Sequence, residues 1–347
     1  MERDVRYCTT EDGVRIAYSV EGEGPPLLFC HYVYSFSLSY IVPTYEDALR
    51  RIGRGHALIR YDMRGSGLSQ REVDHMSIET STLDIEAVVR ALGLDRFILL
   101  GATSGGGRAI HYASRNPDRV SALILYEAYP RLLDAYPREL MEMFCVLARA
   151  NWAAATRSLT DIATRTRQPE EQLNWMRLIQ NSITGQAVAQ LIDAQMDFDA
   201  TLLLGQIACP TLVVHSRNDV QWPFVHGRRL AEGIPDARLV PLEGDAGGAF
   251  TDPDQAIEAI QAFLQEQSGS IAHRMGEEGG EVRQLTPRET EILRLIATGR
   301  TSKEISQELS LSVRTVGRHI TNIYGKIGAR TRADATAYAL RHRLAED

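Results

Sequence analysis

The stretch Gly101-Ala-Thr-Ser-Gly-Gly-Gly107 places two hydroxyl side chains among residues small enough for a tight turn. A serine or threonine hydroxyl attacks a carbonyl carbon when a neighbouring base takes its proton. Two registers are possible, one with Thr103 at the centre of the turn and one with Ser104 there. The stretch is therefore a candidate nucleophile turn for acyl transfer.

A second group of residues has the chemistry of DNA binding. In the helix expected after Ser312, polar and cationic side chains fall opposite an apolar stripe that runs from Val316 to Ile327, and such side chains bond phosphates and base edges in a major groove. The two lysines of the chain are expected to hold phosphates. The candidate DNA contacts are Lys303, Arg314, Thr315, Arg318, Thr321, Asn322, Lys326 and Arg330.

Apolar runs that alternate with helical patterns indicate a mainly parallel sheet covered by helices on both faces, a doubly wound α/β fold. Between about residues 130 and 205 the strand signal disappears and four helical patterns follow, which predicts a lid. The expected strands are 27–30, 57–61, 97–100, 122–126, 211–214 and 238–242. A polar, glycine-rich stretch at 268–283 reads as a linker. We therefore expect a sensing domain at 1–267 and a DNA-binding domain at 284–347.

Several motifs of residues 10–267 resemble the α/β-hydrolase fold. They are the opening Asp12-Gly-Val-Arg, the turn Asp62-Met-Arg-Gly-Ser-Gly, and a late strand that ends in Asp219. The spacing to Asn116-Pro-Asp fits this family with Thr103 at the nucleophile turn. A β-branched residue is unfavourable there, because the positive φ costs about 1–3 kcal/mol.

The same resemblance implies a catalytic acid at Asp219 and a histidine base after the last strand. The corresponding position is Gly247, in Leu242-Glu-Gly-Asp-Ala-Gly-Gly. Loss of the base removes a factor of about 10⁴ to 10⁶ from triad catalysis. Thr103, Asp219 and Gly247 thus predict a degenerate triad and a domain that is not an enzyme.

Ligand binding by the same domain is a separate expectation. The loop after the first core strand borders the cavity in this fold, and Glu127 ends the strand that follows the nucleophile turn. Structural packing is the alternative role for each of these residues. The candidate ligand contacts are His31, Tyr32, Tyr34, Thr103, Ser104, Glu127 and Trp222.

The C-terminal segment carries strong helix-start signals. Thr286 and Glu289 form a capping box around Pro287, and Thr301 and Glu304 repeat it. A third helix begins after Ser312 and a fourth spans about 332–341, so four helices are expected in this all-α domain.

Residues 285–344 resemble the LuxR-type (GerE) helix-turn-helix of bacterial transcription regulators. The match runs through L-T-x-R-E-x-E-I-L, K-E-I, L-S-x-R-T-V and R-T-R-A-D-A. It implies binding of double-stranded DNA as a homodimer. Gly317 replaces a lysine that is usual there, and glycine weakens a helix by about 1 kcal/mol relative to alanine. Base reading is therefore expected from Arg318, Thr321 and Asn322.

The charge distribution agrees with a DNA-binding role for the C-terminal segment and a different role for the front part. Residues 285–347 hold 11 basic and 7 acidic side chains, whereas the whole chain has a net charge of −7, so the front part is acidic. No run of about 18 apolar residues and no signal-peptide core is present, so we expect a cytoplasmic protein with no membrane contact. The four cysteines lack metal or redox spacing, and no cofactor or metal is expected.

Together these features predict a transcription regulator whose hydrolase-like domain binds a small, partly apolar effector and controls DNA binding. One alternative is a working esterase-like enzyme that degrades its own signal through Thr103 or Ser104. The second is a ligand-free scaffold that only brings two DNA-binding modules together.

Overall fold

Eight strands form one sheet in the computed structural model, which describes residues 4–31, 33–164, 168–243, 253–277, 285–309, 311–327, 332–341 and 344. The strands are β1 (Arg6–Thr9), β2 (Arg15–Glu21), β3 (Pro26–Cys30), β4 (Ala57–Tyr61), β5 (Phe97–Ala102), β6 (Val120–Tyr126), β7 (Thr211–Ser216) and β8 (Ala237–Leu242). Their order is β1-β2-β4-β3-β5-β6-β7-β8, and β2 pairs antiparallel with β1 and β4 while all other pairs are parallel. This is the predicted α/β-hydrolase sheet.

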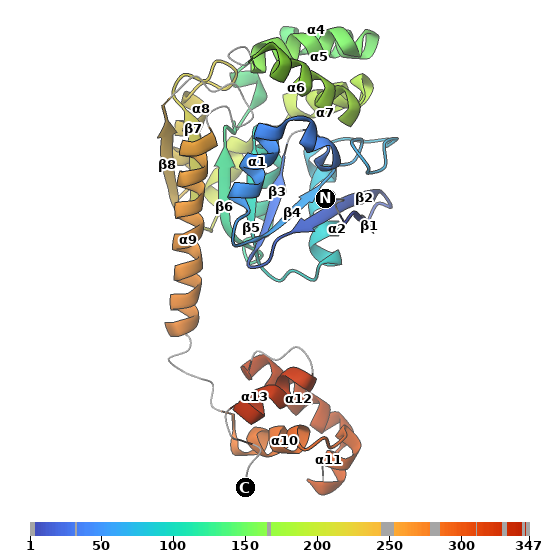
Figure 1. Ribbon diagram of the computed structural model, residues 1–347, viewed down its shortest axis with the longest axis vertical. Helices are drawn as coiled ribbons and strands as arrows, with labels where there is room; N and C mark the ends of the chain where they lie inside the picture. The colour runs from blue at the N-terminus through green and yellow to red at the C-terminus, as the bar shows by residue number, and fades with distance from the viewer. Residues whose placement is uncertain are drawn as a thin grey trace. The chain divides into compact units, whose positions relative to one another are not determined.

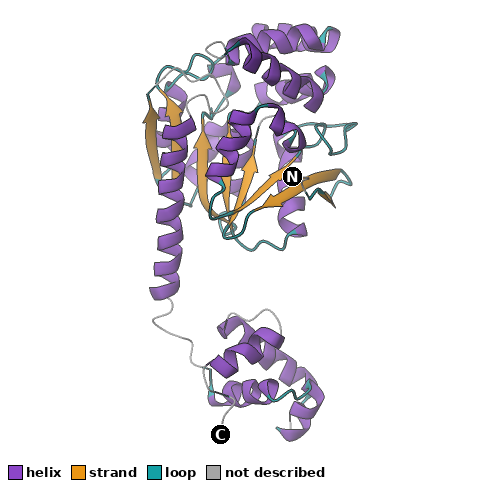
Figure 2. Ribbon diagram, viewed as in Figure 1, coloured by secondary structure: helices purple, strands orange, loops and turns teal. Residues whose placement is uncertain are grey.

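The strands are hydrophobic on both faces, because both faces are covered. Leu27 and Phe29 of β3 join one buried cluster, whereas Leu28 and Cys30 join another, as the two-residue period of a strand requires. One cluster includes helices α1 (Pro43–Ile52) and α9 (Pro253–Glu277). The other includes α2 (Ile78–Ala91), α3 (Gly105–Arg115) and α8 (Val225–Gly233). Figure 2 shows the helices on both faces of the sheet.

The predicted lid is present between β6 and β7. Its elements are η2 (Leu132–Asp134), α4 (Arg138–Ala150), α5 (Trp152–Ala163), α6 (Pro169–Ser182), α7 (Gly185–Met196) and η3 (Ala200–Gln206). Figure 1 shows α4 to α7 over the carboxyl ends of the central strands. Helix α4 packs on α7 and α5, and α6 packs on η1 (Phe36–Ile41). Ligand sites of open α/β sheets lie at these strand ends, so the lid covers the expected place.

The Asp62 turn positions the loop that precedes η1. The buried carboxylate of Asp62 accepts hydrogen bonds from Ser35 Oγ (2.8 Å), Phe36 N (2.9 Å) and Leu68 N (2.7 Å). Gly67 has a φ of +52°, and a Cβ added there would lie 1.9 Å from Asp62 Oδ2. The motif therefore serves a structural purpose, because only glycine fits beside this carboxylate.

The chain divides into two units, Met1–Ser268 and Gly269–Asp347. Residues 268–283 were expected to be a linker, but α9 continues as a helix to Glu277. The buried Ile257, Ile260 and Phe263 anchor this helix on the sheet, and a helix that is already nucleated extends at little cost. In the described part of the chain, no helix is long and apolar enough to cross a membrane.

The second unit contains the four predicted helices. They are α10 (Pro287–Ala297), α11 (Ser302–Glu308), α12 (Val313–Ile327) and α13 (Arg332–Arg341). Both predicted capping boxes are formed, at Thr286 with Glu289 and at Thr301 with Glu304. The unit has its own core, which comprises Ile292, Leu293, Ile296, Ile305, Val316, Ile323, Ala335 and Ala339. These local signals are strong because each satisfies backbone N–H groups at a helix start.

Candidate functional site in the hydrolase unit and the DNA-binding unit

Thr103 occupies a strained turn between β5 and α3. Its φ is 49°, while Ser104 is helical with a φ of −66°. The N–H of Thr103 donates to Tyr126 O (2.9 Å) and its carbonyl accepts from Gly106 N (3.0 Å). A β-branched residue at positive φ persists only where its surroundings fix it. Thr103 is therefore the residue that this turn presents, in the geometry of a nucleophile elbow.

The glycines beside Thr103 allow the backbone to pack closely. A Cβ at Gly105 would lie 2.1 Å from Cys30 O, and one at Gly106 would lie 2.5 Å from Ala128 Cβ. At Gly107 the closest atom would be 3.4 Å away, on Phe198, which is an ordinary contact. Two of the three consecutive glycines are thus required by close contacts of α3 with its neighbours.

A buried acidic cluster lies where β6 and β7 end. Glu127 has a φ of 46° and no exposed surface. Its Oε1 accepts hydrogen bonds from Ser216 N (3.0 Å) and Ser216 Oγ (2.5 Å). Burial raises the pKa of Glu127 well above its usual range, and the nearby charge of Asp219 raises it further. Two close carboxyls do not both ionise readily, so burial and Asp219 together favour the protonated form of Glu127.

Asp219 and His215 fix the loop that carries Trp222. Asp219 Oδ1 accepts from the backbone N–H of Gln221 (2.7 Å) and of Trp222 (2.9 Å). His215 Nε2 lies 2.6 Å from Trp222 O and must carry the proton, because a carbonyl only accepts. Burial lowers the pKa of His215 to about 4, so its ring is neutral. Asp219, which is expected as the catalytic acid, thus holds the backbone of Gln221 and Trp222, two residues that line a pocket.

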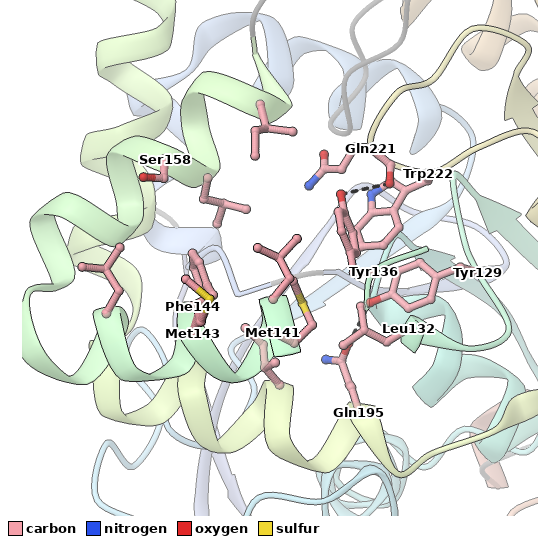
Figure 3. Close-up of a pocket in the computed structure, with 15 residues that line it drawn as sticks. Tyr129, Leu132, Tyr136, Met141, Met143, Phe144, Ser158, Gln195, Gln221 and Trp222 are labelled. Atoms are coloured by element: carbon pink, nitrogen blue, oxygen red, sulfur yellow. Dashed lines mark hydrogen bonds between the residues drawn. The ribbon is translucent and has the colours of Figure 1, made fainter. Parts of the chain in front are cut away.

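An apolar pocket of about 460 Å³ lies between the lid helices and the loops that follow β6 and β7. Its lining residues are Tyr129, Leu132, Tyr136, Leu140, Met141, Met143, Phe144, Leu147, Ser158, Leu159, Ile162, Ile192, Gln195, Gln221 and Trp222. Figure 3 shows their side chains converging from α4, α5 and α7 and from the two loops. A volume of several hundred Å³ with mostly apolar walls is typical of small-molecule sites.

The pocket has an apolar rim and an ordered aromatic end. Met143 on α4 is 69% exposed although it lines the pocket, and Leu140 and Ile162 are also exposed. At the other end Trp222 stacks on Tyr129, with ring centroids 4.1 Å apart, and meets the edge of Tyr136. One end is thus fixed, whereas the rim is an incompletely covered apolar surface.

The residues predicted to bind a ligand are only partly brought together. Trp222 lines the pocket, whereas His31, Tyr34, Thr103, Ser104 and Glu127 are not among its lining residues. His31 Nε2 lies 2.9 Å from Tyr61 O, and Tyr34 packs against Tyr45 and Trp175. Tyr32 and Gly247 lie outside the described residues. The ligand contacts therefore remain predictions, and the lid residues that form the pocket were missed.

In the second unit, two predicted DNA contacts already have protein partners. Lys326 Nζ lies 2.5 Å from Glu289 Oε2, which is part of the first capping box. Thr315 Oγ1 lies 2.7 Å from Ser312 Oγ, and Ser312 caps the start of α12. Lys303 on α11 is exposed. The side chains of Arg314, Arg318, Thr321, Asn322 and Arg330 lie outside the described residues, so these contacts stay predictions.

Comparison with known families agrees with both units. Residues 45–244 match the family described as "Serine aminopeptidase, S33", and this match spans more than half of the chain. The chain belongs to this family. Residues 283–339 match "Bacterial regulatory proteins, luxR family", which makes the C-terminal unit a DNA-binding domain and the chain a transcription regulator.

Relatives of this S33-family regulator align with its front unit over nearly their whole length. The AB hydrolase superfamily protein YisY of Bacillus subtilis (strain 168) is 27% identical over 265 residues, which is 74% of this chain and 97% of that protein. The bifunctional esterase/perhydrolase DCH of Acinetobacter calcoaceticus is 27% identical over 282 residues, 74% and 99% of the two chains. An esterase from Exiguobacterium antarcticum has the same fold, with a TM-score of 0.66, 23% identity and coverage of 76% and 98%.

These relatives correct the prediction that the regulator is not an enzyme, which was wrong. They include a bifunctional esterase/perhydrolase, and the match extends over almost the entire hydrolase unit. In addition, Thr103 retains the strained backbone of a nucleophile elbow. Gly247, at the position where the family motif has its histidine, does not by itself make the hydrolase unit inactive.

Proposed function

We propose that this transcription regulator binds a small, largely apolar effector in the pocket under its lid, and that the effector controls DNA binding by a homodimer. The observation that carries the proposal is the 460 Å³ pocket in a chain that also has a LuxR-family DNA-binding domain. Its walls are aliphatic, aromatic or uncharged, so an apolar molecule loses little hydrogen bonding on entry.

The exposed rim gives the effector a way to change the lid. Met143 and Leu140 on α4 and Ile162 on α5 line the pocket and face water. A ligand that covers them favours lid arrangements in which α4 and α5 lie closer to it. A ligand shifts a conformational equilibrium only through its difference in affinity for the two states, and burial of these side chains supplies that difference.

The DNA side of the proposal uses the predicted cations of the second unit. Lys303 is exposed and available for a phosphate contact, and Arg318 with Thr321 and Asn322 is assigned to base edges. Two copies of the regulator are expected to bind two half-sites. Affinity for DNA should fall as salt rises, because phosphate contacts release counterions.

Pocket occupancy is tested with the neutral apolar dye Nile red on the full-length protein. The variant Leu159→Trp adds an indole to the pocket wall, and Leu173→Trp on α6 is the control because Leu173 is exposed outside the pocket. We expect saturable dye binding that Leu159→Trp weakens by at least about 10-fold and Leu173→Trp leaves unchanged. Equal binding by both variants, or no binding by the unaltered protein, would refute the pocket assignment.

A second function, hydrolysis of a bound ester through Thr103, is favoured by the nucleophile-elbow backbone at this residue. Thr103→Val keeps the branched shape and removes the hydroxyl, whereas Ser104→Ala removes the neighbouring hydroxyl. Turnover of 4-nitrophenyl butyrate is expected to drop by more than about 100-fold in Thr103→Val and to persist in Ser104→Ala. Unchanged turnover in Thr103→Val would exclude this route.

A further inference from the structure

Two buried hydrogen-bond donors line the pocket without a partner among the described residues. Gln195 and Trp222 are 6% and 7% exposed, and neither Gln195 Nε2 nor Trp222 Nε1 meets an acceptor in the part of the chain that the structure describes. Both side chains line the pocket, and Figure 3 shows them near its aromatic end. A buried N–H without an acceptor is costly, so a native site that retains two of them has a use for them.

Both donors are held in place by the surrounding structure. Tyr129 Oη donates to Gln195 Oε1 (2.7 Å), which orients the amide so that its Nε2 remains available. Trp222 is fixed by its stack on Tyr129 and by backbone hydrogen bonds to Asp219 and from His215. Donors fixed before binding lose little freedom when a ligand arrives, which is the arrangement of a selective site.

The charge of the pocket restricts the ligand further. All of the described residues that line it are uncharged, so a carboxylate, phosphate or ammonium group would meet no counter-ion among them. The two fixed groups are donors, and they require acceptor atoms on the ligand. The remaining walls are mostly methionine, leucine, isoleucine and phenylalanine side chains, which suit hydrocarbon, together with Tyr129, Tyr136, Ser158 and Gln221.

We propose that Gln195 and Trp222 select an uncharged, mainly hydrocarbon molecule that carries carbonyl-type oxygens, as in a long-chain ketone or ester, by donating hydrogen bonds to those oxygens. The inference rests on the proposed effector pocket and names the chemical class that it takes. Leu140 and Met143 then contact the hydrocarbon part near the rim.

The test compares 2-decanone with 1-decene as competitors that displace Nile red from the full-length protein. These probes have the same chain length, and only the ketone offers an acceptor. The variants are Gln195→Met, Gln195→Glu and Trp222→Phe. Gln195→Glu keeps an acceptor for Tyr129 and replaces the donor with a carboxylate, so it remains informative if Gln195→Met is unstable.

Matched controls lie outside the pocket. Gln186→Met changes an exposed glutamine of the same helix, α7. Trp175→Phe removes another buried indole whose Nε1 has no partner, in a different cluster. Neither change is expected to alter the preference for ketone over alkene.

We expect the unaltered protein to prefer 2-decanone, and each pocket variant to lower that preference by about 10-fold. Equal competition by ketone and alkene in the unaltered protein would overturn the donor assignment and leave the effector pocket standing. An undiminished ketone preference in all three pocket variants would overturn it as well. Failure of Nile red and both competitors to bind would overturn the proposed pocket function itself.

Discussion

The nucleophile turn and the lid pocket belong to the same unit but are built in opposite ways. Around Thr103 the backbone is strained, and a Cβ added at Gly105 or Gly106 would lie too close to neighbouring atoms. In the pocket, by contrast, apolar side chains such as Met143 remain exposed, and two buried donors meet no acceptor among the described residues. The backbone of the turn is fixed by contacts within the protein, although the buried Ser104 Oγ has no hydrogen-bond partner among the described residues. The pocket has an exposed apolar surface and donors that a ligand would satisfy.

The two regions correspond to two separate properties, reaction at Thr103 and binding of a ligand in the lid pocket. The motif at Gly101–Gly107 predicts only the turn, whose backbone at Thr103 supports the proposed ester hydrolysis there. The pocket depends on α4, α5 and α7, which contribute no residue to that motif. We therefore expect that recognition of a ligand in the pocket and reaction at Thr103 can be altered independently.

The largest effect is expected at the tightest glycine. Gly105→Ala places a Cβ 2.1 Å from Cys30 O and should lower the free energy of unfolding of the hydrolase unit by about 3 kcal/mol. Gly107→Ala is the matched control, with an expected change below about 1 kcal/mol. Urea unfolding followed by tryptophan fluorescence measures both, because Trp152, Trp175 and Trp222 all lie in this unit. Equal stability of the two variants would contradict the close-packed turn.

A smaller effect is expected from His215 on acidification. Burial lowers its pKa to about 4 in the native state from an ordinary value of 6.5. Below pH 6.5 the unfolded chain binds a proton that the native ring does not, so stability is lost as pH falls toward 4. The slope is about 1.4 kcal/mol per pH unit, or about 2 kcal/mol between pH 6.5 and 5.

The control for this prediction separates His215 from the other titrating groups. His215→Asn should remove that part of the pH dependence, while His75→Asn, at an exposed histidine, should not. Unfolding curves at several pH values give the slopes. Nile red affinity of the folded protein should stay constant over the same range, because none of the described residues that line the pocket is charged. An identical slope in His215→Asn would refute the neutral buried histidine.

The smallest effect concerns a glycine with open space around it. Apart from its chain neighbours and the backbone of its own helix turn, no described atom lies within 4 Å of a Cβ built at Gly317 in α12, so alanine fits there. Gly317→Ala should stabilise the DNA-binding unit by up to about 1 kcal/mol, because glycine is the poorer helix former. Far-UV circular dichroism during thermal unfolding reports this change without a shift in tryptophan fluorescence. A loss of stability would contradict it.

Local signals explain how much could be predicted from sequence. The capping pairs at Thr286 and Thr301 and the helices that follow them were predicted because each signal lies within a few residues. The sheet was predicted from its short runs of apolar residues, which the structure buries. The pocket could not be predicted, because Gln195, Leu159 and Trp222 meet only after β6, β7 and the lid are assembled.

Contacts between residues that are distant in the sequence also explain where particular predictions and the structure differ. Lys326 is predicted to contact DNA, and this stays a prediction, but the structure also pairs it with Glu289, which lies 37 residues earlier in the chain. Residues 268–277 looked like a linker from composition, but α9 continues through them from a buried anchor. Such outcomes depend on partners that are distant in the sequence, and composition alone does not contain them.

The central claim is that a ligand in the lid pocket controls DNA binding. The most direct test measures the affinity of the full-length regulator for a DNA site, selected from random sequences, without and with saturating 2-decanone. We predict a change of at least about 5-fold that disappears in Leu159→Trp and persists in Leu173→Trp. The same DNA affinity with and without saturating ligand would contradict the account.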